Sequence, residues 1–252
     1  MKKIAIASQK GGTGKTTTSL SLSSYLARQG KKVLLVDVDS QANSSKVLVP
    51  EYLKLKKDET ICATILDRKP LVIYETAVPN LHLVPSHILL SDADTKLTVA
   101  RDHREARLKT ELDKIEDNYD FVFLDCPPSL GWLTVNAFTS ANTILIVVSP
   151  GYFELDSVVQ LNKTLQEVKE YYNPDLDLLG LLFVMGDPTV NSRESLKILR
   201  QTYPGSVFNT IIPRNTDLRD AHFQKKDIFE YNPRSKGALA YKRLVEEIWQ
   251  KK

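Results

Sequence analysis

Cysteine is scarce in this chain of 252 residues. The two cysteines, Cys62 and Cys126, lie far apart and match no metal-ligand spacing. This pattern argues against a disulfide framework and against an iron–sulfur site, and it suits a reducing compartment. We therefore expect a cytoplasmic protein.

Long apolar runs are also missing. No run approaches the roughly 18 residues of a membrane-spanning helix, and the N-terminal stretch lacks a signal-peptide pattern. No internal repeat, low-complexity tract or linker divides the chain, and its hydrophobic content of 42% is ordinary for a globular protein. These absences predict one α/β domain over residues 1–252 with no transmembrane segment.

A large excess of one charge is absent as well, since the net charge is only +3. The distribution is uneven, because residues 186–252 carry 13 Lys and Arg against 8 Asp and Glu. This bias is compatible with an anionic partner, and a solvated helical surface explains it equally well.

What the chain does contain is a glycine-rich loop near its start. Residues 10–17 have the sequence K-G-G-T-G-K-T-T, between a predicted buried strand at 3–8 and a predicted helix at 17–29. Glycines let the backbone bend so that successive N–H groups face one concavity. The three glycines are Gly11, Gly12 and Gly14. A strand, a glycine loop and a helix in this order predict a phosphate site.

The lysines and threonines of the loop give the site its chemistry. Lys15 supplies a charge for β- and γ-phosphates, and the Thr16 hydroxyl can ligate Mg²⁺. The start of the helix adds the positive end of its dipole. Lys10 has no role in an ordinary loop of this kind.

Two continuous apolar runs end in an acid, at residues 33–37 and 121–125. Such runs are typical of buried parallel strands, whose carboxyl ends lie beside the phosphate loop in a doubly wound sheet. Asp37, Asp39 and Asp125 are therefore expected near the phosphates. Asp125 either holds the metal through water or caps the following turn.

The rest of the pattern alternates strands with amphipathic helices. We expect further strands at 81–85, 142–150, 178–185 and 207–212, and helices at 60–66, 101–117, 154–172, 192–202 and 237–251. Residues 40–45 are expected as a polar loop, and Pro127, Pro128 and Gly131 disfavour a helix directly after the second acid. The predicted fold is a single-domain, doubly wound and mostly parallel sheet with helices on both faces.

Five motifs occur in order: K-G-G-T-G-K-T-T (10–17), V-D-V-D-S-Q-A-N (36–43), F-L-D-C-P-P-S (123–129), I-P-R-N (212–215) and Y-N-P-R-S-K-G-A (231–238). Together they resemble the deviant-Walker P-loop ATPases, and most closely the ParA/Soj branch that partitions plasmids and chromosomes. The resemblance covers nearly the whole chain and is weakest over residues 46–100. No separate N-terminal helix-turn-helix domain is expected before the loop.

The resemblance implies that two copies enclose two ATP molecules, with Mg²⁺ as the metal. Lys10 matches the signature lysine that reaches the partner's phosphates, so ATP should dimerise the protein whereas ADP should not. Asp39 matches the acid that orients or activates the attacking water, and Asp37 supports the metal shell. Further nucleotide contacts are implied for Thr13 and Thr17 on the loop and for Met185, Pro213 and Arg214 near adenine. Lys10, Lys15 and Asp39 are the implied catalytic residues.

Family members of the Soj kind bind double-stranded DNA without sequence preference as ATP dimers. A ParB-type centromere-binding partner stimulates their slow ATP hydrolysis, so the resemblance implies association with the nucleoid. Binding of this kind weakens steeply with salt. The candidate DNA contacts in this chain are Arg193, Lys197, Arg200, Arg219, Lys225 and Lys226. Asp217 stands where some relatives carry a DNA-contacting arginine, which leaves that contact to Arg219 or to another basic patch.

Two other functions stay open from the sequence. A MinD-like membrane switch needs an amphipathic C-terminal helix, and residues 241–252 offer Leu244, Val245, Ile248 and Trp249 for one. A helix packed on the domain explains the same pattern. A metabolic kinase or ligase of this fold needs a substrate-binding insertion, and none is apparent.

Overall fold

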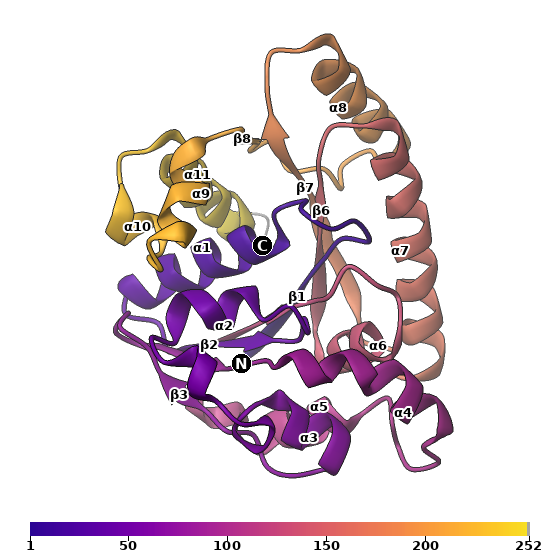
Figure 1. Ribbon diagram of the computed structural model, residues 1–252. Helices are drawn as coiled ribbons and strands as arrows, with labels where there is room; N and C mark the ends of the chain where they lie inside the picture. The colour runs from indigo at the N-terminus through magenta and orange to yellow at the C-terminus, as the bar shows by residue number, and fades with distance from the viewer. Residues whose placement is uncertain (251–252) are drawn as a thin grey trace.

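The computed structural model describes residues 1–250, with their side chains except at 152–154 and 249–250. Within this part of the chain, one eight-stranded sheet has the order β3-β4-β2-β5-β1-β6-β7-β8, with helices on both sides (Figure 1). Neighbouring strands run parallel except for the pair β3 and β4. The predicted doubly wound α/β fold is confirmed.

Strands and helices alternate over much of the chain, although β3 and β4 are consecutive and three helices follow β8. The strands are β1 (Lys2–Ala7), β2 (Val33–Asp37), β3 (Tyr74–Glu75), β4 (Leu81–Val84), β5 (Phe121–Asp125), β6 (Thr143–Val148), β7 (Asp177–Gly186) and β8 (Ile212–Pro213). The helices are α1 (Lys15–Arg28), α2 (Asn43–Leu48), α3 (Ile61–Asp67), α4 (Ala93–Val99), α5 (Arg107–Asp113), α6 (Trp132–Ser140), α7 (Tyr152–Tyr171), α8 (Val190–Thr202), α9 (Thr216–Phe223), α10 (Ile228–Tyr231) and α11 (Lys236–Gln250). Short 3₁₀ turns are η1 (Tyr52–Lys54), η2 (Lys57–Glu59), η3 (Ile88–Asp92) and η4 (Glu116–Asn118).

The central strands are apolar along their length because helices cover both faces of the sheet. Every residue of β2 and β5 is buried, as is every residue of β1 after Lys2. The parallel register of β2 and β5 sets Asp37 directly beside Asp125. The carboxyl ends of these strands therefore meet at the edge from which β1 continues into the glycine loop.

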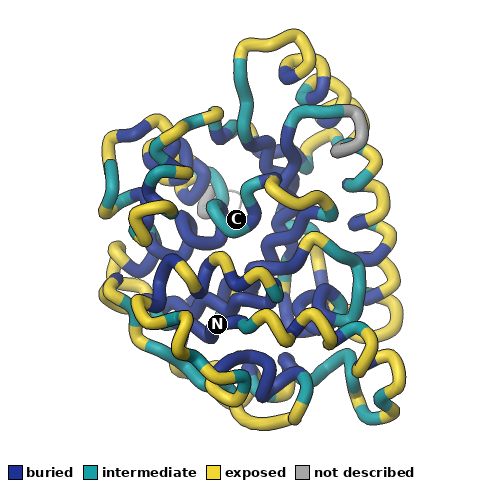
Figure 2. The backbone as a smooth tube through the Cα atoms, in the orientation of Figure 1, coloured by how far each residue is buried: buried dark blue, intermediate teal, exposed yellow. Residues whose placement is uncertain are grey.

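The core consists of two apolar layers, one on each face of the sheet. The buried stretches of backbone lie in the interior of the molecule (Figure 2). One layer packs side chains of α3 to α8 against the sheet, and the other packs side chains of α1, α2, α9, α10 and α11. The predicted inward residues of α7 are all buried: Val158, Leu161, Leu165 and Val168. Among the described residues, no helix is long and apolar enough to cross a membrane.

The helix predicted over residues 101–117 is wrong in length, because α5 covers only Arg107–Asp113. His103 has a left-handed φ of 41°, which a helix does not allow. Arg104 donates from Nη1 to carbonyl oxygens at the end of α4, and its guanidinium lies 4.1 Å from the centre of the Trp132 ring. Contacts distant in sequence therefore replace the first helical turns.

Other boundaries also differ from the sequence pattern. The loop expected at 40–45 turns into α2 at Asn43, and the strand expected at 207–212 is an isolated bridge at Val207 followed by β8. α6 and α9 were not predicted. The predicted end of the last helix at Lys251, like the side chain of Trp249, lies outside the described residues.

Candidate functional site

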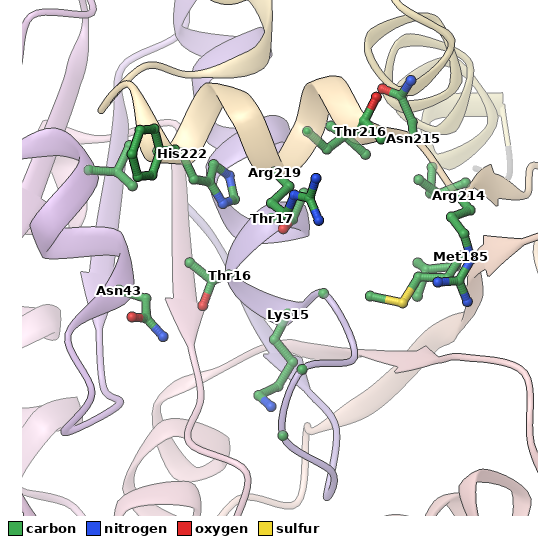
Figure 3. A pocket seen from close by; sticks show the side chains of 18 of the residues that line it. Lys15, Thr16, Thr17, Asn43, Met185, Arg214, Asn215, Thr216, Arg219 and His222 are labelled. Carbon is green, nitrogen blue, oxygen red and sulfur yellow. The ribbon is translucent and has the colours of Figure 1, made fainter.

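A cavity of about 860 Å³ opens at the carboxyl edge of the sheet between two walls (Figure 3). We call residues 10–17 the P-loop wall, and we call Met185 together with residues 212–223 the α9 wall. The P-loop wall lines the cavity with Gly11, Gly12, Gly14, Lys15, Thr16 and Thr17. The α9 wall lines it with residues that include Met185, Pro213, Arg214, Arg219, His222 and Phe223.

The P-loop wall takes its shape from glycine conformations and from short contacts to one carbonyl. Gly12 and Gly14 have φ values of 76° and 88°, in the left-handed region that favours glycine. The carbonyl oxygen of Lys10 accepts hydrogen bonds from Thr13 Oγ1 at 3.1 Å and from Lys15 Nζ at 3.2 Å. Thr13 is buried and is not among the cavity-lining residues, so its hydroxyl closes the loop.

Lys15 lies at the floor of the cavity and is only 6% exposed. Burial lowers the pKa of its ammonium, while the carboxylates of Asp125 and Asp39 act in the opposite direction. A buried ammonium is stable when negative charge surrounds it. The floor of this cavity is therefore prepared for an anion.

Asp37 and Asp125 are fully buried and neither is among the residues that line the cavity. Ser45 donates to Asp37 from its N–H at 2.9 Å and from its Oγ at 2.7 Å. Burial and the neighbouring charge of Asp125 raise the pKa of Asp37 well above its usual value.

Asp125 accepts hydrogen bonds from Ser19 Oγ at 3.1 Å and from Ser44 Oγ at 2.7 Å. Burial raises the pKa of Asp125 to about 6, although hydrogen bonds from Ser44 and Thr16 favour its charged form. The carboxylate thus connects β5 to both α1 and α2. It sits behind Thr16, whose side chain faces the cavity in Figure 3.

Asp39 differs from the two deeper acids because it lines the cavity and keeps 8% exposure. Its Oδ1 accepts the N–H of Gln41 at 2.9 Å, which fixes the carboxylate at the turn before α2. Lys10 is exposed and is not among the lining residues of the same copy. The cavity therefore brings Lys15 and Asp39 together, whereas Lys10 does not line it.

The α9 wall contains the three residues that are predicted to lie near adenine, Met185, Pro213 and Arg214. Met185 has a left-handed φ of 55°, an uncommon conformation for a residue other than glycine and one that is found at functional sites. Arg214 is exposed and pairs through Nε with Asp187 at 3.6 Å. The cavity brings Met185, Pro213 and Arg214 together opposite Thr17.

Several residues at this wall carry no signal in the sequence. His222 and Phe223 line the cavity, and Tyr241 of α11 joins them. The Tyr241 hydroxyl is 3.0 Å from Thr18 Oγ1, so α11 is tied to the helix that follows the P-loop wall. These aromatic residues belong to no recognisable sequence motif. Only their positions beside the cavity, on α9 and α11, identify them.

Among the described residues, no group of three or more His, Cys, Asp and Glu side chains could hold a metal ion. A Mg²⁺ site here fits the other kind of donor set, in which one or two protein oxygens add to phosphate oxygens and water. Thr16 is one of the lining side chains that carry such an oxygen, and it is the one that the loop pattern predicts as the ligand. Asp37 and Asp125 lie one shell further from the cavity.

The basic residues predicted to bind DNA fall into two separate groups. Arg193, Lys197 and Arg200 are exposed on α8, whose buried Ser195 and Leu199 face the other way. Arg219, Lys225 and Lys226 lie at α9 and just after it, and Figure 1 shows α8 and α9 well apart. Arg219 alone among the six lines the cavity.

Comparisons with known proteins place this cavity in context. A family model described as an AAA domain matches residues 1–178. The sporulation initiation inhibitor protein Soj of Bacillus subtilis is 39% identical over 250 residues, which are 98% of this chain and 98% of that protein. The chromosome-partitioning ATPase Soj of Thermus thermophilus is 39% identical over 249 residues, 98% of this chain and 95% of that protein.

A solved structure shares the arrangement. Cobyrinic acid a,c-diamide synthase from Mycobacterium smegmatis, with bound ATP analog and magnesium, has a TM-score of 0.83 and 32% sequence identity. The match covers 99% of this chain and 95% of that chain. The similarity therefore includes the segments that form both walls of the cavity.

Proposed function

This chain belongs to the ParA/Soj family of partition ATPases, and we propose that it is an ATP-dependent DNA segregation switch. ATP and Mg²⁺ bind between the P-loop wall and the α9 wall, two copies associate face to face, and the dimer binds double-stranded DNA without sequence preference. A ParB-type centromere-binding partner stimulates the slow hydrolysis of ATP to ADP and phosphate, which releases the DNA. The expected location is the cytoplasm, on the nucleoid, and residues 1–252 act as one P-loop ATPase domain.

The observation that carries the proposal is the charge of the cavity. Its described lining contains one carboxylate, Asp39, against four cations, which are Lys15, Lys46, Arg214 and Arg219. Lys15 is the buried one of the four, and the carboxylates of Asp125 and Asp39 offset its charge, so the three exposed cations leave the cavity short of negative charge. A nucleoside triphosphate supplies that charge and fills a cavity of ordinary ligand size.

The P-loop wall holds the phosphates in this proposal. Lys15 contacts the β- and γ-phosphates, Thr17 contacts the α-phosphate, and backbone groups at Gly11, Gly12 and Gly14 face the chain of phosphates. Mg²⁺ offsets the charge that develops on the transferred phosphoryl group. Thr16 is the proposed ligand, and its hydrogen bond to Asp125 orients the hydroxyl. Asp37 supports this shell through Ser45.

Asp39 and Lys10 carry the steps that depend on the second copy. Asp39 orients or activates the attacking water, because its carboxylate is the one acid at the cavity among the described lining residues. Lys10 is exposed at the start of the P-loop wall, and we propose that it reaches a phosphate held by a facing copy. Dimerisation then completes the catalytic set, so hydrolysis requires the dimer.

DNA contact is proposed for α8 before the other basic positions. Arg193, Lys197 and Arg200 are exposed and follow one face of the helix at spacings of four and three residues. Lys225 is exposed, whereas Lys226 pairs with Glu230 at 3.1 Å. Contacts of this kind are made to the phosphates of the DNA and therefore give no sequence preference.

The burial of the apolar face of α11 argues against the MinD-like membrane alternative. Tyr241, Leu244 and Val245 are buried in the layer of core that contains α1. A helix that lay on a bilayer in the MinD manner would have to release these side chains, and burying one such side chain stabilises a fold by about 1.5–3 kcal/mol. The apolar face of α11 is therefore assigned to the domain.

Co-sedimentation with DNA tests the proposal directly. The protein is centrifuged with long duplex DNA, and in parallel with anionic liposomes, in the presence of ATP, ADP or a slowly hydrolysed ATP analogue over a salt series. We expect DNA pelleting with ATP and the analogue, none with ADP, and a steep fall with salt. Lipid pelleting with ATP and no DNA pelleting would support the MinD-like alternative instead.

A further inference from the structure

The side of α9 that faces the cavity is not accounted for by the base contacts at Met185 and Pro213. Thr216, Arg219 and Phe223 follow a helical spacing of three and four residues, and all three line the cavity. On the same helix, Ala221 packs into the core, and Leu218 packs into the core while also lining the cavity. The orientation of α9 is thereby fixed, with an arginine presented to the cavity.

Arg219 of α9 and Thr17 of the P-loop wall line the same cavity. The Arg219 side chain is 81% exposed, and its ion pair with the adjacent Asp220 joins Nε to Oδ1 at 3.6 Å. An exposed pair at this distance contributes little free energy. The contact through Nε also leaves the fork of terminal amino groups to meet another oxyanion.

Two of the other cavity cations, Lys46 and Lys15, have firmer contacts within the protein. The third, Arg214, pairs with Asp187 at 3.6 Å, as Arg219 does with Asp220, and it is already proposed to lie near the base. Lys46 donates to the Gln41 carbonyl at 2.7 Å, and its ammonium lies 6.0 Å from the centre of the Tyr52 ring. Lys15 is held at the floor by the Lys10 carbonyl. Arg219 enters from the opposite wall, so the two cations face the space between the walls from two sides.

We propose that Arg219 binds the α-phosphate of the nucleotide from the α9 wall. The proposal rests on the proposed ATP site, and it moves Arg219 from the DNA candidates to the nucleotide. A planar guanidinium matches a phosphate with two parallel hydrogen bonds, and Thr17 marks where the α-phosphate is expected. Arg219 thereby joins the C-terminal part of the chain to the ligand, independently of the γ-phosphate.

The test compares nucleotides that differ in their phosphates. Titration calorimetry measures the affinity of wild type, Arg219→Ala, Arg219→Lys and the control Arg243→Ala for ATP, ADP, AMP and adenosine. Arg243 is an exposed arginine on α11, so its loss removes the same charge without touching the cavity lining. Thermal unfolding of each variant verifies that the fold is kept.

We expect Arg219→Ala to lower the affinities for ATP, ADP and AMP by a similar factor. The factor should be about 10-fold or more, because a charged hydrogen bond is lost. Adenosine affinity should not change, Arg219→Lys should recover only part of the loss, and Arg243→Ala should match wild type. Unchanged affinity of Arg219→Ala for the three phosphorylated ligands, or equal weakening of adenosine, would overturn the assignment. Loss of DNA pelleting with intact nucleotide affinity would return Arg219 to the DNA face. Failure of wild type to bind ATP would remove the proposed function itself.

Discussion

The two walls of the cavity are built in opposite ways. The P-loop wall is one stretch of eight consecutive residues, 10–17, closed by hydrogen bonds within the loop and by left-handed glycines. The α9 wall combines Met185 with β8 and α9, and its cations are exposed, with the Arg219 side chain 81% exposed against 6% for Lys15. We infer that the P-loop wall provides the fixed chemistry and that the α9 wall provides the part that responds to the ligand.

Replacing the cation of the P-loop wall should have the largest effect. Lys15→Ala removes the buried charge at the floor, and we expect ATP affinity to fall by at least about 100-fold, measured by titration calorimetry. The matched control is Lys242→Ala on the exposed side of α11, which should bind ATP like wild type. Normal ATP-dependent dimerisation of Lys15→Ala would refute the assignment of the phosphate site.

Replacing Asp39, the acid that lines the cavity, should separate the binding of ATP from its hydrolysis. Asp39→Ala should bind ATP and dimerise but release phosphate about 100-fold more slowly or worse, since it removes the residue that we propose orients water. The variant should then remain on DNA in the presence of ATP. Phosphate release is measured with and without DNA, and unchanged turnover would exclude Asp39 from the mechanism.

Replacing Lys10 tests whether this residue of one copy contacts the phosphates bound by a second copy. Lys10→Ala should bind ATP as a monomer with nearly wild-type affinity and lose most of its dimer, with a dimer dissociation constant raised about 10-fold or more. Light scattering at several protein concentrations measures the change. A dimer of undiminished strength would place the lysine outside the interface.

A change on α8 should leave both walls intact. The double variant Arg193→Glu and Lys197→Glu is expected to weaken DNA binding about 10-fold or more and to flatten its dependence on salt, because each lost phosphate contact reduces the slope by about 0.9. Dimerisation with ATP should persist, as followed by light scattering. Parallel loss of the dimer would mean that the substitution disturbed the fold or that α8 lies at the interface.

The smallest effect is expected where α11 meets the P-loop helix. Tyr241→Phe removes the hydrogen bond to the buried Thr18 hydroxyl, so the free energy of unfolding should fall by about 1–3 kcal/mol. Urea denaturation measures it, and ATP affinity should change little because the aromatic ring stays at the cavity. An unchanged unfolding midpoint would show that this contact does not stabilise the fold.

The sequence predicted the P-loop wall because its information is local. Glycines, lysines and threonines at fixed spacing determine that loop, and the apolar runs ending in Asp37 and Asp125 determine two central strands. The same reasoning predicted that both acids lie near the phosphates. It could not predict that Ser44 donates a hydrogen bond to Asp125 and that Ser45 donates to Asp37.

The α9 wall was poorly predicted because it depends on contacts distant in sequence. β8 pairs with β7 at only two register positions, so residues 207–212 contain a strand-like pattern without forming a continuous strand. The orientation of Arg219 and Phe223 depends on Leu218 and Ala221 packing beneath α9. A basic residue in a motif-free helix gave no signal that separates nucleotide contact from DNA contact.

A crystal structure with Mg²⁺ and a non-hydrolysable ATP analogue tests most directly whether both walls hold one nucleotide. We expect the triphosphate on residues 11–17, the base between Met185 and Pro213, and Lys10 of each copy at the phosphates of the other. A nucleotide that contacted only the P-loop wall, in a protein still monomeric in solution, would contradict the account.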